Sequence, residues 1–144
     1  MKLLKQTTPT CLVYSAAMAM GIPVSSVTTF LGRDGSEPRP NGAPVGVHMQ
    51  EIQDLALSVD HHFYLVLPSP VQKYRDGGQR TVFQNQGRRF FNHVQGRRGI
   101  LIGRYPQGED HAVAFEGLEI YDPNGMKYMM SEGKYLIEEA WIYV

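Results

Sequence analysis

The chain contains a single cysteine, Cys11, which begins the apolar stretch CLVYSAAMAMG. We expect residues 8–20 to form a buried helix with Thr8 as N-cap and Pro9 at the first helical position, where a missing N–H is tolerated. Cys11 would then lie in the first turn, where unpaired N–H groups and the helix dipole stabilise a thiolate. A lone cysteine in an apolar helix is more often a packing residue, so a nucleophilic role depends on partners elsewhere in the chain.

A nucleophilic cysteine needs a base, and the base must be oriented by a third group. His111 opens the apolar segment HAVAF, and Asp122 ends the next segment, LEIYD. If residues 112–116 and 118–121 pair across a tight turn near Glu116 and Gly117, His111 and Asp122 come opposite each other, where a carboxylate can orient an imidazole. The alternative for Asp122 is a purely structural role, because it also begins the strong turn signal Asp-Pro-Asn-Gly.

Gln6 precedes Cys11 by five positions. Its side-chain amide could donate a hydrogen bond to an oxyanion that forms near the sulfur of Cys11. A solvated glutamine near the N-terminus is the alternative interpretation.

The order Gln6, Cys11, His111 and Asp122 resembles that of the papain-like cysteine peptidase superfamily, nearest to the small bacterial branch that processes double-glycine leader peptides. The segments that carry the resemblance are KQTTPTCLVYSAAMAMG and HAVAFEGLEIYDPNG. The resemblance implies that Cys11 is the nucleophile, His111 the base, Asp122 the group that orients it, and Gln6 part of the oxyanion hole. The chain departs from the family pattern by one residue fewer between Gln6 and Cys11, and by Leu12 where Gly or Trp is common.

The apolar periodicity predicts an α+β domain in which helices come first and a mostly antiparallel sheet follows. The resemblance makes this a single papain-like domain over residues 1–144, with a helical part at about 8–58 and a sheet part at about 61–144. Further helices are expected from Ser25 or Ser26 to Leu31, at 47–58 and at 87–96, the last with Phe90, Phe91 and Val94 inward. The expected strands are 61–68, 99–105, 111–117, 118–122, 126–130 and 138–144. Residues 32–46 and 69–86 are expected to be irregular loops.

The bulk composition is that of an ordinary globular domain, with 144 residues, 42% hydrophobic and 19% charged. A net charge of +0 gives no general attraction to nucleic acid or membrane, so neither is expected as a partner. Lys5 interrupts any signal peptide, and the apolar segment 11–24 is shorter than the roughly 20 residues of a membrane span. With one cysteine there is no internal disulfide. We therefore expect a cytoplasmic protein. Its resemblance to other short bacterial proteins implies that it comes from a bacterium or a bacterial virus.

The charges are nevertheless unevenly distributed along the chain. Residues 73–104 carry eight basic residues against one acid, Asp76, whereas residues 105–144 carry two bases against eight acids. Either the two segments are neighbours whose charges pair, or the basic segment faces an acidic partner. The motif Asp60-His61-His62 does not predict a metal site, because adjacent strand residues point to opposite faces. No metal or other cofactor is expected.

Two classes of function remain open. The first is a thiol hydrolase that cleaves a peptide, isopeptide or side-chain amide bond in a protein or peptide, and the same residues suit deamidation of glutamine or transfer to an amine. The second is a non-catalytic binding protein that grips a partner protein with the loops 32–46 and 69–86, because a fold does not imply an activity.

Overall fold

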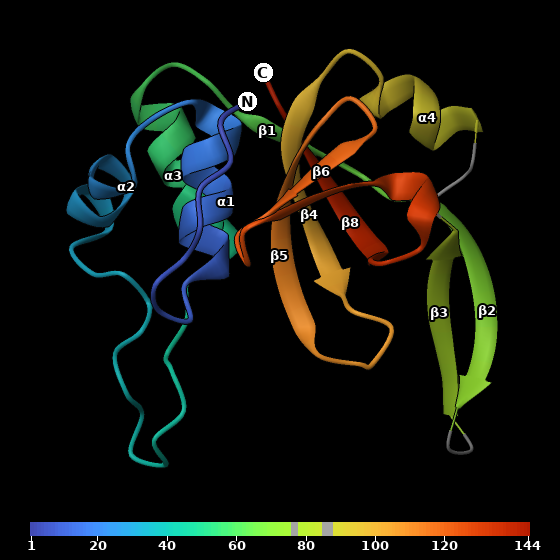
Figure 1. Cartoon of the computed structure of the whole chain (residues 1–144), viewed down its shortest axis with the longest axis horizontal. Helices are drawn as coiled ribbons and strands as arrows, with labels where there is room; N and C mark the ends of the chain where they lie inside the picture. Colours follow the sequence, from blue (N-terminus) through green and yellow to red (C-terminus); the bar gives the residue numbers. More distant parts are fainter. Residues whose placement is uncertain (76–77, 85–87) are drawn as a thin grey trace.

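The computed structural model describes residues 1–75, 78–84 and 88–144, and these form an α+β fold with three of the helices on one side and a sheet on the other (Figure 1). Three helices stand together on the left of the view: α1 (Cys11–Met20), α2 (Val24–Leu31) and α3 (Met49–Ser58). The short helix α4 (Arg88–Val94) lies apart from them, beside the sheet. The expected α+β class is confirmed.

The main sheet has six strands in the order β1-β8-β4-β5-β6-β7, and all neighbouring strands are antiparallel. The two central strands, β4 and β5, are joined by a turn, so the end of β4 lies beside the start of β5. The strands are β1 (Phe63–Val66), β4 (Arg98–Arg104), β5 (Asp110–Glu116), β6 (Glu119–Asp122), β7 (Met126–Met129) and β8 (Leu136–Tyr143).

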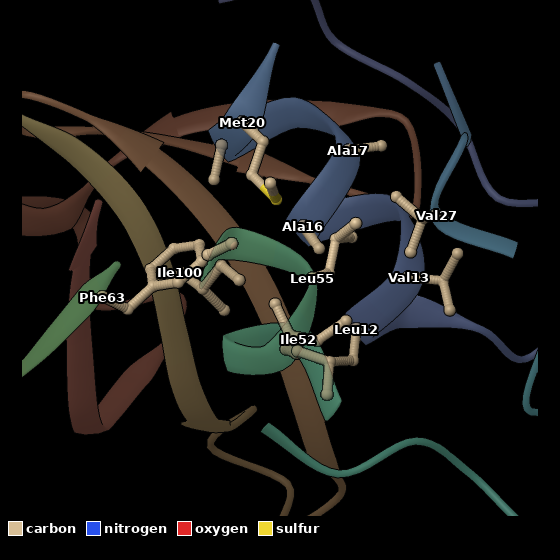
Figure 2. Packing of buried hydrophobic residues seen from close by; sticks show 13 residues of the cluster. Leu12, Val13, Ala16, Ala17, Met20, Val27, Ile52, Leu55, Phe63 and Ile100 are labelled. Atoms are coloured by element: carbon tan, nitrogen blue, oxygen red, sulfur yellow. The ribbon is translucent and has the colours of Figure 1, made fainter. Parts of the chain in front are cut away.

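Helix α1 lies between the sheet and the other two helices, which explains why it is apolar nearly all round. Its small residues Ala16 and Ala19 are fully buried and allow its backbone to approach its neighbours closely. Figure 2 shows Ile52 and Leu55 of α3 pointing into the same cluster as Leu12 of α1. This packing fixes the position of α1 and therefore of Cys11 at its N-terminal end.

The helix begins later than the sequence predicts. Its first residue is Cys11 and its N-cap is Thr10, so the expected start of the helix at residue 8, with Thr8 as N-cap and Pro9 at the first helical position, is wrong. The Thr10 hydroxyl donates to the Thr8 carbonyl oxygen at 3.3 Å and makes no capping bond to the helix. As a result Cys11 occupies the first helical position, where the N–H groups of the first turn have no intrahelical partners.

The segment expected to be an irregular loop at 69–86 instead contains two strands, β2 (Ser69–Arg75) and β3 (Gly78–Gln84), paired antiparallel to each other. The sequence Asp76-Gly77 between them is a hairpin signal, because Asp-Gly is typical of two-residue turns between antiparallel strands.

The other helices and strands lie within a few residues of their expected ranges. In α4, Phe90 and Val94 are buried as expected, but Phe91 is 38% exposed, so its inward placement is wrong. The loop 32–46 has one isolated bridge, between Pro38 and Pro44. Its base is closed by Arg33, which donates two hydrogen bonds to the Glu51 carboxylate at 2.8 and 2.9 Å.

No single helix among the described residues is long and apolar enough to cross a membrane. Helices α1 and α2 reach that length and composition only as a pair, and the chain bends by 118° between them.

The packing of α3 against α1 generates a prediction about stability. Ile52→Ala should lower the free energy of unfolding by about 2–4 kcal/mol, because Ile52 is 0% exposed and its loss leaves a cavity under α1. Leu57→Ala on the same helix removes a side chain that is 61% exposed and should change stability by less than about 0.5 kcal/mol. Urea unfolding followed by circular dichroism measures both, and equal losses would contradict the assigned packing.

Candidate active site

The thiol of Cys11 meets the start of β5, where His111 is the second residue of the strand. The His111 side chain lies close enough to the thiol for each group to shift the pKa of the other. The backbone N–H groups of Ala112 and Leu12 also face the sulfur and lower the pKa of the thiol. Leu12 can do so because no side chain caps this end of α1, so its N–H is free for the sulfur.

The other side of the His111 ring contacts Asp122 at the end of β6. His111 Nε2 and Asp122 Oδ1 are 2.7 Å apart. The pairing of Ala114 with Tyr121 continues to place Asp122 opposite Val113, so His111 is its diagonal neighbour and the expected directly opposite placement is wrong. The diagonal is nevertheless within reach of long side chains, and the expected contact is present.

Asp122 is 0% exposed, yet its carboxylate oxygens have four donors. Oδ1 accepts from His111 and from the Asn124 backbone N–H at 3.0 Å. Oδ2 accepts from the hydroxyls of Tyr105 at 2.8 Å and Tyr128 at 2.6 Å. The bond from Asn124 is the turn-forming bond that the Asp-Pro-Asn-Gly signal predicts, so Asp122 combines the structural role with the contact to His111.

The charges of the three groups follow from these contacts. Burial raises the pKa of Cys11, but its hydrogen bonds to His111 and to the backbone outweigh burial and bring that pKa below its ordinary value. Burial lowers the pKa of His111, whereas the bonds to Asp122 and Cys11 raise it, with a net result of about 9. Burial raises the pKa of Asp122, and its donors lower it to below the ordinary value. At neutral pH the site therefore holds an imidazolium beside a carboxylate, and next to them a thiol whose ionisation is favoured.

Three tyrosines surround this row, and sequence reasoning missed all of them. Tyr105 stacks on the His111 ring, with centroids 4.8 Å apart. Tyr135 meets the same ring edge-on at 6.4 Å and donates its hydroxyl to the backbone carbonyl oxygens of Leu101 and His111. Tyr128 supplies the second hydroxyl on Asp122. The only sequence signal was the use of tyrosine rather than phenylalanine, because a buried hydroxyl needs a partner.

Cys11 and His111 open onto a cleft of about 400 Å³ between the helical layer and the sheet. A β-bulge in β4 at Ile102 and Gly103 shapes its sheet side. A Cβ on Gly103 would lie 1.9 Å from the Leu136 carbonyl oxygen, so no larger residue fits there. The remaining cleft walls are apolar at Leu12, Val47, Met49 and Ala112, and polar at His48, Asp110 and Glu138.

Gln6 lies next to the turn that follows Asp122. Its backbone N–H donates to the Pro123 carbonyl oxygen at 2.7 Å. Its side-chain Oε1 is buried and has no hydrogen-bond partner in the part of the chain that the structure describes. In the same described part, no hydrogen bond joins the Gln6 amide to Cys11, so the structure brings together Cys11, His111 and Asp122 and places Gln6 beside the last of them.

The remaining sequence expectations concern charge and metals. Arg104, which is almost fully buried, pairs with Glu138 of β8 at 3.5 Å, so at this point the basic and acidic segments neighbour each other. The side chains of residues 69–87 lie outside the described part. The structure therefore describes the surroundings of the basic residues in the segment 73–104 only from Arg88 onward. Within the described residues, no group of three or more His, Cys, Asp or Glu side chains could hold a metal ion.

Comparisons of the chain with models of protein families, with curated proteins and with solved structures find no match.

The buried carboxylate generates a prediction about pH and stability. Asp122→Asn should lower the free energy of unfolding at pH 7 by about 2–4 kcal/mol, because it removes the charge from a site built of donors. The pKa of Asp122 is lower in the folded protein than in the unfolded chain. Its stabilisation is therefore present above about pH 4 and is lost as pH falls through the folded-state pKa. Urea unfolding at pH 7, 5 and 3 should show that the wild type is more stable than Asp122→Asn at pH 7 and that this difference becomes smaller at acid pH.

The exposed Asp54 of α3 provides the control for this prediction. Asp54→Asn should stay within about 0.5 kcal/mol of the wild type at each pH. A stability difference between wild type and Asp122→Asn that is the same at pH 3 and pH 7 would contradict the assigned charge state.

Proposed function

We propose that the protein is a papain-like thiol hydrolase that cleaves an amide bond of a protein or peptide, whether a peptide, isopeptide or side-chain bond. The observation that carries the proposal is the row of Cys11, His111 and Asp122, in which His111 lowers the pKa of the thiol and contacts a carboxylate that has no exposure to water. The α+β fold, with the cysteine at the start of a central helix and the histidine on an antiparallel strand, is compatible with that family.

The stability of the folded protein gives little reason for burying such a row of charged groups. Removing charged groups from water is expensive, and apolar residues in their place are often as stable or more stable. Perturbed pKa values that gather at one cleft are typical of functional sites. Here the thiol, the imidazole and the carboxylate all have shifted pKa values, and two of the three groups line the same cleft.

The first chemical step is attack by the Cys11 sulfur on the carbonyl carbon of the substrate. The carbonyl electron pair moves to oxygen, and this oxyanion needs hydrogen-bond donors. The backbone N–H of Cys11, at the first position of α1, is one such donor by its place in the helix. The Gln6 side-chain amide is the second donor that we propose, because its segment is fastened beside Asp122.

His111 then transfers its proton to the leaving nitrogen, and the intermediate collapses to a thioester on Cys11. Because Nε2 faces Asp122, the nitrogen that serves the thiol and the leaving group is Nδ1. In the second half of the reaction, His111 takes a proton from water, and the resulting hydroxide attacks the thioester. The product acid leaves, and the Cys11 thiolate returns to its pair with the imidazolium. Asp122 keeps the ring in one orientation throughout.

An unoxidised thiolate is required at every turnover. A reducing compartment maintains free cysteines, so the proposed chemistry fits a cytoplasmic location.

Alkylation with iodoacetamide tests the state of Cys11 without any knowledge of the substrate. The wild type should be alkylated with a midpoint clearly below about pH 8.5, the value of a free cysteine, because His111 and the backbone lower the pKa of the thiol. His111→Ala should move the midpoint above that of the wild type, since burial raises the pKa of Cys11 and little then opposes it. The exposed His62→Ala, away from the cleft, is the matched control and should follow the wild type.

The hydrolase proposal fails if the wild-type alkylation midpoint coincides with that of a free cysteine. It fails equally if His111→Ala leaves the midpoint where it was in a folded protein.

Product analysis tests the reaction itself. Protein mixtures incubated with the wild type and with Cys11→Ala should differ, by mass spectrometry, in new chain ends or released isopeptide partners that appear only with the wild type. Conversion of glutamine to glutamate would instead identify a deamidase, and a new cross-link to an amine would identify a transferase. Binding of the same protein by both variants, with no product from the wild type, would favour the non-catalytic alternative.

A further inference from the structure

Tyr105 contacts both members of the His111–Asp122 pair. Its ring lies nearly parallel to the imidazole, at an interplanar angle of 24°. Its hydroxyl donates to Asp122 Oδ2 at 2.8 Å and accepts from the Asn124 side-chain amide at 3.2 Å. Tyr128 donates to the same carboxylate oxygen, but within the described residues its ring makes no stacking contact with His111.

The turn between β4 and β5 holds Tyr105 in this place. The Tyr105 backbone N–H donates to the Glu109 carbonyl oxygen at 3.1 Å, and the Gly108 N–H donates to the Tyr105 carbonyl oxygen at 2.8 Å. These two hydrogen bonds hold the backbone of Tyr105 in the tight turn that precedes β5. Its ring covers one face of the imidazole, while Tyr135 meets the ring edge-on.

We propose that Tyr105 is a positioning residue for His111: its ring fixes the plane of the imidazole and favours the imidazolium, while its hydroxyl shares with Tyr128 the binding of Asp122. The inference rests on the proposed function, because it concerns the base of that reaction. An aromatic face attracts a cation that lies against it. Rotation of the imidazole would break both the stack and the 2.7 Å contact with Asp122.

Other groups also influence the orientation and the charge of His111, and substitutions of Tyr105 leave these groups in the chain unchanged. The titratable groups around the ring and in its cleft are Cys11 from α1, Asp122 from β6, Tyr135 ahead of β8, and His48, Asp110 and Glu138 of the cleft walls. Within the described residues, Tyr105 is the one whose ring lies flat against the imidazole. Its variants can therefore separate the effect of the stack from the effect of the hydroxyl.

The test is the pH profile of Cys11 alkylation by iodoacetamide in the full chain. Tyr105→Leu removes the stack and should raise the alkylation midpoint by about one pH unit, which leaves about tenfold less thiolate on the acid side of the profile. Tyr105→Phe keeps the stack and removes only the hydroxyl. Tyr128→Phe removes the matching hydroxyl from the same carboxylate oxygen. Both should stay within about 0.3 pH unit of the wild type and of each other.

Circular dichroism establishes that each variant is folded over the pH range. If Tyr105→Leu does not fold, Tyr105→Met replaces it, because methionine is flexible enough to fill the gap and has no aromatic face. A folded Leu or Met variant with the wild-type midpoint overturns the proposal. Equal shifts in Tyr105→Phe and Tyr105→Leu also overturn it, since the hydroxyl and not the ring would be responsible. A wild-type midpoint at the free-cysteine value counts instead against the hydrolase itself.

Discussion

The carboxylate of Asp122 has no contact with water, and the rest of the site depends on how the fold compensates for this. An ionised carboxylate loses several kcal/mol of hydration when it is buried. Four hydrogen-bond donors replace that hydration, and they come from four places in the chain: the β4–β5 turn, the start of β5, the turn after β6, and β7. Because each donor needs its own segment in place, the carboxylate couples the order of the sheet to the state of His111.

The carboxylate of Asp122 lies in the sheet, but it influences the cysteine of the helical layer through His111. Asp122 orients His111, and His111 in turn stabilises the thiolate of Cys11. Cys11 can interact with His111 only if the N-terminal end of α1 is held against β5. The small buried residues of α1 and the side chains of α3 behind it provide that position. The apolar core is thus as necessary to the arrangement of the site as the polar row itself.

Much of this arrangement follows from the sequence because it depends on local signals. The turn at Glu116 and Gly117 and the strands around it predict a hairpin, and the hairpin brings His111 within reach of Asp122. The start of α1 was harder to predict, because Thr8 and Thr10 are both suitable N-caps and the burial of Thr10 is a tertiary effect. The tyrosines could not be predicted, since no local pattern indicates that a hydroxyl will meet a carboxylate from a distant segment.

Cys11 and His111 lie far apart in the sequence, the former in the first helix and the latter on the fifth strand. A chain that is still being synthesised displays the cysteine long before the ribosome has made β5 and β6. During that time the thiol has no imidazole and no Ala112 N–H beside it, and it behaves as an ordinary cysteine. In nascent or unfolded copies the groups that lower the pKa of the thiol are therefore not in place, so the reactivity of Cys11 depends on completion of the tertiary structure.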